Sequence, residues 1–239
     1  MIGYGNSMFL ATHGILAGGG TPAAPPIITT NLLMHLDAGN AASYQGTGTT
    51  WTDLTGNAYN GTLNNGVAYS TSNGGVLIYD GVDDYAIVSS HTKSALVNPT
   101  GKFTLQFWVY ISGSQSSVGV FQMANNLSSG EPWLLLQRQT NTSIRWFLNG
   151  GFRITQTITT NTWYNLALSY DGTIWRVYID GVQSSTYTGA IGTLNATSLV
   201  LANGFSGYLN GRMPHILSYT TNLSAAQILQ NYNALKPRY

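Results

Sequence analysis

Two stretches of alternating side chains constrain the fold of this chain more than any other feature. In residues 103–111, FTLQFWVYI, the aliphatic and phenylalanine side chains at every second position point to one face, and the residues between them point to the other. Residues 163–170, WYNLALSY, alternate in the same way. A period of two is typical of β-strands that pack one face against a core. The sequence therefore predicts a protein built from sheets.

Turn dipeptides separate the predicted strands. Asp171-Gly172 follows residues 163–170, and Asp180-Gly181 follows the strand-like residues 175–179. Asp-Gly between two such runs is a strong hairpin signal. We expect further strands at residues 76–80, 85–89, 133–138, 143–148, 152–158, 198–203 and 213–219. Many short strands with little helix favour an antiparallel sandwich or barrel.

One helix is predicted, over residues 224–235 near the C-terminus. Ser224 and Gln227 have the spacing of a capping box, and Leu223 and Ile228 have that of a hydrophobic staple. Pro237 is expected to end the helix, because proline cannot continue the backbone hydrogen-bond pattern.

The first 30 residues differ in composition from the rest. Residues 18–26, GGGTPAAPP, have the composition of a linker, and they follow an apolar island at residues 8–17, MFLATHGILA. Such an island cannot bury its own apolar groups, so it either docks to another chain or folds back on its own domain. We predict an attachment arm over residues 1–30 and one domain over residues 31–239. The attachment residues would be Met8, Phe9, Leu10, Ile15 and Leu16.

Charge and composition exclude several classes of function. Only 7% of the residues are charged, the net charge is +1, and the basic residues are scattered, which argues against nucleic-acid binding. No apolar run reaches the length of a membrane span, and the N-terminus lacks the basic region of a signal peptide. The absence of cysteine excludes disulfides. A surface so poor in charge suits an extracellular or assembled protein.

Several segments, in their order along the chain, resemble the laminin-G-like, concanavalin-A-like domain family. The similarity is to the version found in tailed-phage virion proteins. The matching segments are LLMHLDAGNAASY (32–44), WTDLTGNAYNGTLNNG (51–66), YDGVDDY (79–85), FTLQFWVY (103–110), NTWYNLALSYDG (161–172), VYIDGV (177–182) and the closing residues 207–239. The resemblance implies an all-β, two-sheet antiparallel jelly-roll sandwich. It also implies carbohydrate or protein binding, with calcium in some members.

The carboxylate pattern of the related glucanases is missing from this sequence, which argues against glycan hydrolysis. A glycosidase needs two carboxylates, and related glucanases carry Glu and Asp close together on one strand. This chain has a single glutamate, Glu131, and Asp171 and Asp180 lie in predicted hairpin turns. His35 and His215 lie in strand-like segments, where packing or hydrogen bonding within the strand is a simpler interpretation than a role as metal ligands. We therefore expect a non-catalytic protein.

Two candidate sites remain, one for a metal and one for a glycan. Calcium prefers oxygen ligands, and two turn-rich segments supply Asp53, Asn57, Asp80, Asp83 and Asp84. The alternative is that these side chains only bond nearby backbone amides. A glycan would need an exposed aromatic ring with amides beside it. The candidates are Trp108, Trp133, Asn125 and Asn126.

These observations favour a virion structural protein of a tailed phage, either a capsid-decorating protein or a tail-fibre subunit. The arm would attach it to other virion proteins, homo-oligomers are expected, and the sandwich would face outward and bind a surface glycan. No nucleic acid or membrane is expected as a partner. The alternative is a secreted or cell-surface carbohydrate-binding module, which would bind its glycan as an isolated domain.

Overall fold

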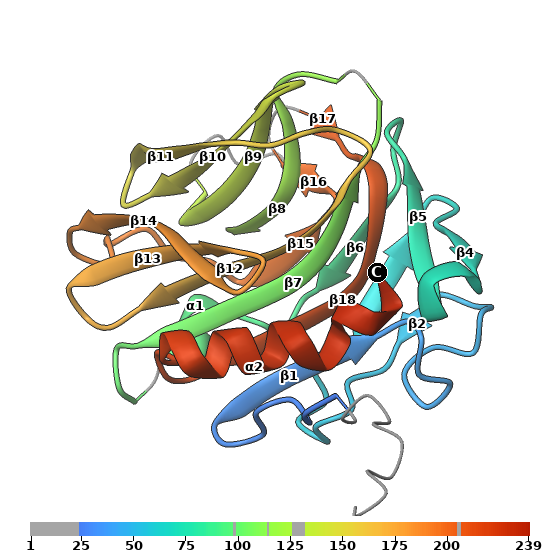
Figure 1. Ribbon diagram of the computed structural model, residues 1–239, viewed down its shortest axis with the longest axis horizontal. Coiled ribbons are helices and arrows are strands. Elements are labelled where there is room, and N and C mark those ends of the chain that lie inside the picture. The colour runs from blue at the N-terminus through green and yellow to red at the C-terminus, as the bar shows by residue number, and fades with distance from the viewer. Residues whose placement is uncertain (1–23, 98, 114, 126–131, 205–206) are drawn as a thin grey trace, which may run out of the picture.

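The computed structural model describes residues 24–97, 99–113, 115–125, 132–204 and 207–239. Within them the chain forms two antiparallel sheets that pack face to face, and a C-terminal helix lies across the outer side of one sheet (Figure 1). This arrangement confirms the predicted all-β, two-sheet sandwich with one C-terminal helix.

The first sheet, called sheet A here, has the strand order β14-β13-β12-β7-β18-β5-β4, and β1 pairs with β18 beside this path. Its strands are β1 (Leu32–Asp37), β4 (Ala68–Ser70), β5 (Val76–Asp80), β7 (Phe103–Ile111), β12 (Trp163–Tyr170), β13 (Ile174–Ile179), β14 (Val182–Thr188) and β18 (Asn210–Tyr219).

The second sheet, sheet B, has the order β11-β10-β9-β8-β15-β6-β3-β2. Its strands are β2 (Thr50–Trp51), β3 (Gly61–Asn64), β6 (Tyr85–Val88), β8 (Val118–Ala124), β9 (Leu134–Thr140), β10 (Ser143–Leu148), β11 (Gly151–Thr157) and β15 (Ser198–Leu201). A small hairpin joins β16 (Asn203–Gly204) to β17 (Gly207–Tyr208). The helices are α1 (Lys93–Val97) and α2 (Ala225–Leu235), with 3₁₀ turns at Ser72–Gly74 and Lys236–Arg238.

The predicted strands agree with the structure wherever one face meets the core and the other is polar. Residues 76–80, 103–111, 143–148 and 163–170 are strands with the predicted bounds. The sequence did not indicate β8, in which every residue is buried and no alternation appears. The Asp180-Gly181 hairpin signal implied a strand after it, but the bounds of β14 were not predicted, because β14 is a polar strand at the edge of sheet A.

The core lies between the two sheets. As predicted, the apolar face of β7 points into it, and the tryptophans of β10 and β13 fill its centre. Its large members include Trp51, Trp133, Trp146, Trp175, Tyr79, Phe103, Phe107 and Phe121, all fully or almost fully buried. Close packing of such rings accounts for the low exposure of the sandwich interior.

Helix α2 begins at the predicted capping box. The backbone N–H of Gln227 donates to Ser224 Oγ at 3.3 Å, and Gln227 Oε1 accepts from the Ser224 N–H at 2.9 Å. Its inner face covers polar groups on sheet A, so these groups must find partners there. Gln106 Nε2 donates to Asn165 Oδ1 at 2.7 Å, and Asn231 Nδ2 donates to Gln106 Oε1 at 2.9 Å. The buried amides therefore hold the helix to the sheet.

Strand β18 changes partners along its length. Its first part pairs with β5 and its second part with β1, and its register against β7 shifts between Arg212 and His215. Pro214 lies at this shift, and its lack of an N–H is the physical reason for a local break in the ladder. The carbonyl of Pro214 instead accepts from the Ala38 N–H at 2.8 Å. After this break, β18 continues against β7 in a shifted register, which includes His215.

The β16–β17 hairpin packs against strand β8 of sheet B at two glycines. A Cβ added at Gly119 would lie 2.1 Å from the backbone nitrogen of Gly204, which is closer than any real contact. Only glycine on β8 allows the two backbones to approach this closely.

The predicted arm falls almost entirely outside the described residues, and so do Met8, Phe9, Leu10, Ile15 and Leu16. The described end of that segment packs on the domain. Ile27 and Ile28 contact the apolar cluster beneath α2, and the Ile28 N–H donates to Asn231 Oδ1 at 2.8 Å. Among the described residues, no helix is long and apolar enough to cross a membrane.

Candidate functional site

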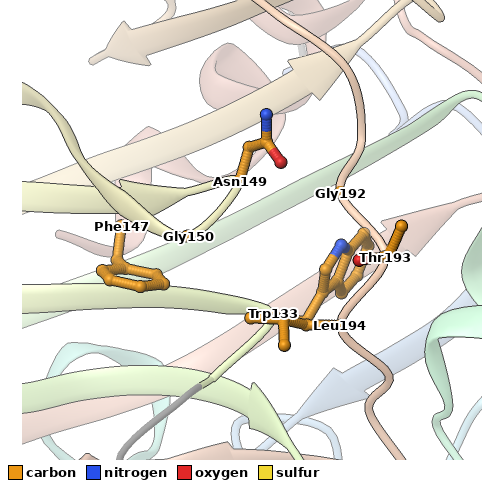
Figure 2. Close-up of a pocket in the computed structure, with 7 residues that line it drawn as sticks. All are labelled: Trp133, Phe147, Asn149, Gly150, Gly192, Thr193 and Leu194. Carbon is orange, nitrogen blue, oxygen red and sulfur yellow. The ribbon is translucent and has the colours of Figure 1, made fainter.

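A pocket of about 300 Å³ opens at one end of sheet B (Figure 2). It lies between the start of β9, the turn from β10 to β11, and the loop that precedes β15. Its lining residues are Trp133, Phe147, Asn149, Gly150, Gly192, Thr193 and Leu194. This set, called the Trp133 pocket below, includes one of the residues predicted from the sequence.

Trp133 is the fixed element of this pocket. Only 1% of its surface is exposed, and its indole N–H donates to the Ile191 carbonyl at 2.7 Å. Behind it, the Phe103 ring lies 5.6 Å away between centroids. The indole is therefore held from both sides and forms a rigid wall.

Lys93 of α1 holds the loop that precedes β15. Its ammonium group donates to the carbonyls of Gly192 at 2.7 Å and Leu194 at 2.8 Å, and it lies 5.2 Å from the centre of the Trp133 ring. Partial burial lowers the pKa of Lys93. Two carbonyl bonds and a cation–π contact thus fix the loop against the tryptophan.

Positive backbone angles shape the rim. Asn149 and Gly150, at the β10–β11 turn, have φ of 50° and 76°, as a two-residue hairpin turn requires. Gly192 has φ of 80°, and a Cβ there would lie 2.9 Å from Asn149 Oδ1. The glycine therefore lets the loop approach the turn, which brings the Asn149 amide to the pocket.

The other residues of the predicted glycan site lie elsewhere. Trp108 is on the outer face of sheet A and is 3% exposed, because Tyr232 stacks on it at 5.6 Å and Tyr239 packs at 4.5 Å. The C-terminal residues leave no ring face for a ligand, which removes Trp108 from the candidates. Asn125 follows β8 and is exposed, outside the pocket lining, and Asn126 is outside the described residues.

The predicted calcium ligands separate into two groups. Asp53 is buried and accepts from the N–H groups of His35, at 2.9 Å, and Tyr59, at 3.2 Å, and from Thr55. Asn57 donates its amide to the Leu33 carbonyl at 2.9 Å. These bonds are the turn contacts of the alternative interpretation, and they occupy the Asp53 carboxylate. Asp53 and Asn57 therefore do not fit a calcium site.

Asp80, Asp83 and Asp84 do converge. One carboxylate oxygen of each lies within 4.8 Å of the others. Asp84 is 4% exposed, its Oδ2 accepts from the Asp80 N–H at 3.1 Å, and its buried Oδ1 has no hydrogen-bond partner. Burial raises the pKa of Asp84; the hydrogen bond from the Asp80 N–H opposes this, and the charges of Asp80 and Asp83 add to it. The unpartnered oxygen and the oxygen-only donor set fit a hard cation such as Ca²⁺.

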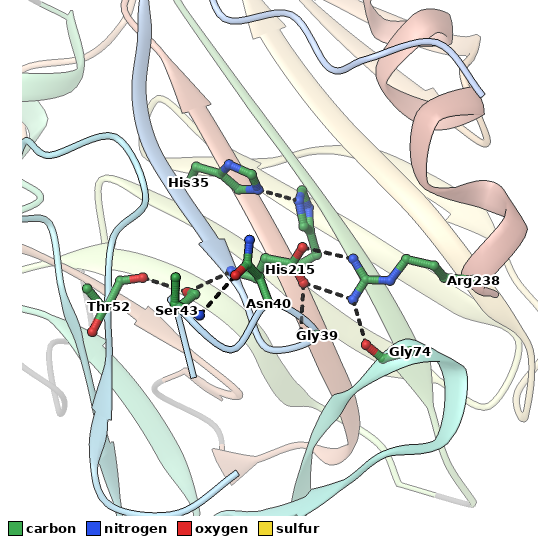
Figure 3. Close-up of polar contacts among 10 residues, drawn as sticks. His35, Gly39, Asn40, Ser43, Thr52, Gly74, His215 and Arg238 are labelled. Carbon is green, nitrogen blue, oxygen red and sulfur yellow. Dashed lines mark hydrogen bonds and ion pairs between the residues drawn. The ribbon is translucent and has the colours of Figure 1, made fainter. Parts of the chain in front are cut away.

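A second polar cluster contains His35 and His215, which the sequence indicated as packed or hydrogen-bonded strand residues without indicating that they meet. His35 Nε2 lies 3.0 Å from His215 Nε2, and Asp37 forms a two-point ion pair with Arg238 at 2.8 and 2.9 Å (Figure 3). Burial lowers the pKa of both histidines, that of His215 to about 3. The only sequence signal was that His35 and Asp37 are two residues apart on one strand face.

The two carboxylates at the predicted hairpin turns, Asp171 and Asp180, have structural partners. Asp171 pairs with Arg176 at 2.6 Å, and hydrogen bonds from backbone N–H groups and Arg176 lower its pKa to about 2. Asp180 Oδ1 accepts from the Asn165 N–H at 2.8 Å. Glu131 lies outside the described residues. The Trp133 pocket has no carboxylate among its lining residues, so its described groups offer hydrogen bonding and stacking.

Solved structures of known proteins resemble this fold. The sialidase of Trypanosoma rangeli, in complex with sialic acid, aligns with a TM-score of 0.68 at 14% identity, covering 91% of this chain and 36% of the sialidase chain. The receptor-binding domain of botulinum neurotoxin C/D mosaic serotype aligns with a TM-score of 0.67 at 15% identity, covering 86% and 51%. The chain thus spans about a third to a half of these proteins.

The sequence itself carries a family signature. No curated protein sequence is significantly similar to the chain. The Laminin_G_3 family, described as "Concanavalin A-like lectin/glucanases superfamily", matches residues 80–229, which contain the predicted YDGVDDY turn in part, β7, β12 and the hairpins after it. Together with the two-sheet sandwich, this match places the chain in the concanavalin A-like lectin/glucanase superfamily.

Proposed function

We propose that this protein is a non-catalytic virion structural subunit of a tailed phage, either a capsid-decorating protein or a tail-fibre subunit, and that its sandwich binds a host-surface glycan. The observation that carries the glycan part is the Trp133 pocket. It combines a rigid indole with an amide and a hydroxyl at a loop-lined end of a lectin-like sandwich.

The chemistry of the lining suits a sugar. Phe147 is partly exposed and offers apolar ring surface for the C–H face of a pyranose, with the buried Trp133 as the rigid wall behind it. The Asn149 amide and the Thr193 hydroxyl can bond sugar hydroxyls. Such a pocket is mostly preformed, because Lys93 and the Ile191 carbonyl already hold its walls. Preorganisation reduces the entropy lost on binding.

The absence of catalysis is part of the proposal. Hydrolysis of a glycosidic bond requires two carboxyl groups about 5–10 Å apart around the bond. The described lining of the pocket supplies none. A bound oligosaccharide incubated with the purified protein should therefore be recovered intact. Turnover that Glu131→Gln abolishes would contradict the proposal.

A binding experiment with matched variants tests the glycan site. On an array of bacterial surface glycans, Phe147→Ala and Thr193→Ala should each weaken binding about tenfold, as loss of one stacking contact or hydrogen bond implies. Thr47→Ala makes the same chemical change at another exposed loop, and Asn125→Ala tests the other candidate predicted from the sequence. Equal affinity of all four variants would mean that the glycan, if bound, lies elsewhere.

The virion role rests on the low charge of the chain and on the composition of its first 30 residues. Ile27 and Ile28, in the described end of this segment, are anchored to the domain, so the residues before them would be tethered at a defined point. Nine linker residues in an extended conformation could span roughly 25 Å. That reach suits attachment to other virion proteins or to a second copy of this chain.

Truncation separates this role from that of a secreted or cell-surface carbohydrate-binding module. A variant without residues 1–25 should remain folded, with a nearly unchanged melting temperature, but fail to incorporate into particles or oligomers. Particle occupancy is measured by mass spectrometry. Incorporation at full occupancy would refute the attachment arm, and glycan binding by an isolated domain with no particle association would favour the secreted module.

A further inference from the structure

The cluster of His35, Asp37 and His215 on the outer face of sheet A is built by strand register. His35 and Asp37 are two residues apart on β1 and therefore face the same side. Asp37 is paired directly with His215 on β18. Three metal-ligating side chains from two adjacent strands thus project into one small region (Figure 3).

The distances within this cluster suit a metal ion. The two Nε2 atoms are 3.0 Å apart, and one ring nitrogen of each histidine and a carboxylate oxygen of Asp37 all lie within 4.8 Å of one another. With metal–nitrogen bonds of ~2.1 Å, two ligands at a right angle lie ~3.0 Å apart, and two at a tetrahedral angle ~3.4 Å apart. The histidine nitrogens are therefore already near ligand spacing, and the Asp37 carboxylate lies within reach of the same point after a local side-chain adjustment.

The carboxylate is oriented by its outer partners. Asp37 Oδ1 accepts from the Gly39 N–H at 2.9 Å and from Arg238 Nη2 at 2.8 Å, whereas Oδ2 accepts from Arg238 Nη1 at 2.9 Å. Oδ2 therefore keeps one lone pair beyond its bond to Arg238. A ligating carboxylate held by a hydrogen-bonding neighbour is the usual second layer of a metal site.

The site also has access to solvent. His215 is 1% exposed, but His35 is partly exposed and lines a pocket of about 290 Å³ beside Leu54, Thr55 and Asn57. An ion can enter from this pocket and keep a water molecule on that side. Two neutral imidazoles and one carboxylate are borderline donors, which suit Zn²⁺, Cu²⁺, Ni²⁺ or Co²⁺ rather than the oxygen-seeking Ca²⁺.

We propose that His35, His215 and Asp37 form a binding site for a divalent transition-metal ion of the Zn²⁺ class, with Arg238 as the residue that positions the Asp37 carboxylate. The ion would join β1 to β18 and, through Arg238, to the C-terminal residues. This metal site is separate from the Trp133 pocket and from the acidic Asp80–Asp84 turn.

Zinc and cobalt titrations of the full chain test this site. With excess Ca²⁺ present to occupy oxygen-only clusters, Zn²⁺ should bind one per chain and raise the melting temperature, because it binds only the folded state. Co²⁺ should give a visible absorption band. His35→Gln should weaken the affinities for Zn²⁺ and for Co²⁺ by at least about tenfold. Two control variants should leave both affinities unchanged: His91→Gln, at a buried histidine outside the cluster, and His13→Gln.

A second measurement guards against a variant that fails to fold. Nitrogen NMR of the wild-type imidazoles should show the Nε2 resonances of His35 and His215 shift together on adding Zn²⁺, with no variant needed. Absence of saturable binding at submillimolar Zn²⁺, or binding that His35→Gln leaves intact in a folded protein, would overturn the proposal. The pair would then be a hydrogen-bonded contact only.

Discussion

His91 should make the stability of this domain depend on pH. It follows β6 in the chain, is fully buried, and its Nε2 lies 2.8 Å from Ser218 Oγ. Burial lowers its pKa from 6.5 to about 4. Because the folded state disfavours the protonated ring, the stabilising contribution is complete above about pH 6.5 and is lost as the pH falls towards 4.

The size of this effect follows from the two pKa values. A shift of one pKa unit corresponds to 1.36 kcal/mol, so the full contribution of His91 is about 3 kcal/mol, and about 2 kcal/mol of it is lost between pH 7 and pH 5. That loss is a large part of the 5–15 kcal/mol typical of a domain. Urea unfolding followed by tryptophan fluorescence measures it at each pH.

The matched variant is His91→Gln, which keeps a polar side chain but cannot titrate. His35 and His215 also have lowered pKa values and add to the slope of the wild type. The difference between wild type and variant therefore isolates His91. Its free energy of unfolding relative to the variant should fall by about 2 kcal/mol between pH 7 and pH 5. A difference that stays constant over this range would refute the buried, neutral imidazole.

Three further outcomes are expected. Arg238→Ala should lower the free energy of unfolding by about 2–3 kcal/mol in chemical denaturation, because it leaves the buried Asp37 carboxylate without its cation; an unchanged midpoint would mean that the ion pair is dispensable. Gly119→Ala should cost about 1–3 kcal/mol, because the added Cβ would lie 2.1 Å from Gly204 N; a wild-type melting temperature would show that the hairpin does not pack there. Calorimetry should detect Ca²⁺ binding that Asp84→Ala removes, since that residue carries the unpartnered oxygen; no heat at millimolar Ca²⁺ would leave this segment as a turn.

The strands and the helix cap were predictable because they depend on local patterns. Residues 103–111 alternate so strictly that one face had to meet a core, and the capping box from Ser224 to Gln227 needs only four residues of sequence. The Asp180-Gly181 turn belongs to the same class, with positive φ at both positions. Each of these features is decided within a few residues of chain.

Whether a tryptophan lines a pocket or is covered was decided by tertiary structure. Trp108 and Trp133 are equally plausible ligand residues in the sequence, yet α2 and Tyr239 cover the first, whereas the second forms a pocket wall beside a loop some 60 residues away. The His35–His215 contact joins residues 180 apart, and the Asp37–Arg238 pair joins residues 201 apart. The alternating pattern predicts which face of a strand a side chain occupies. Strand order and the path of the C-terminal residues decide which other side chains contact it on that face.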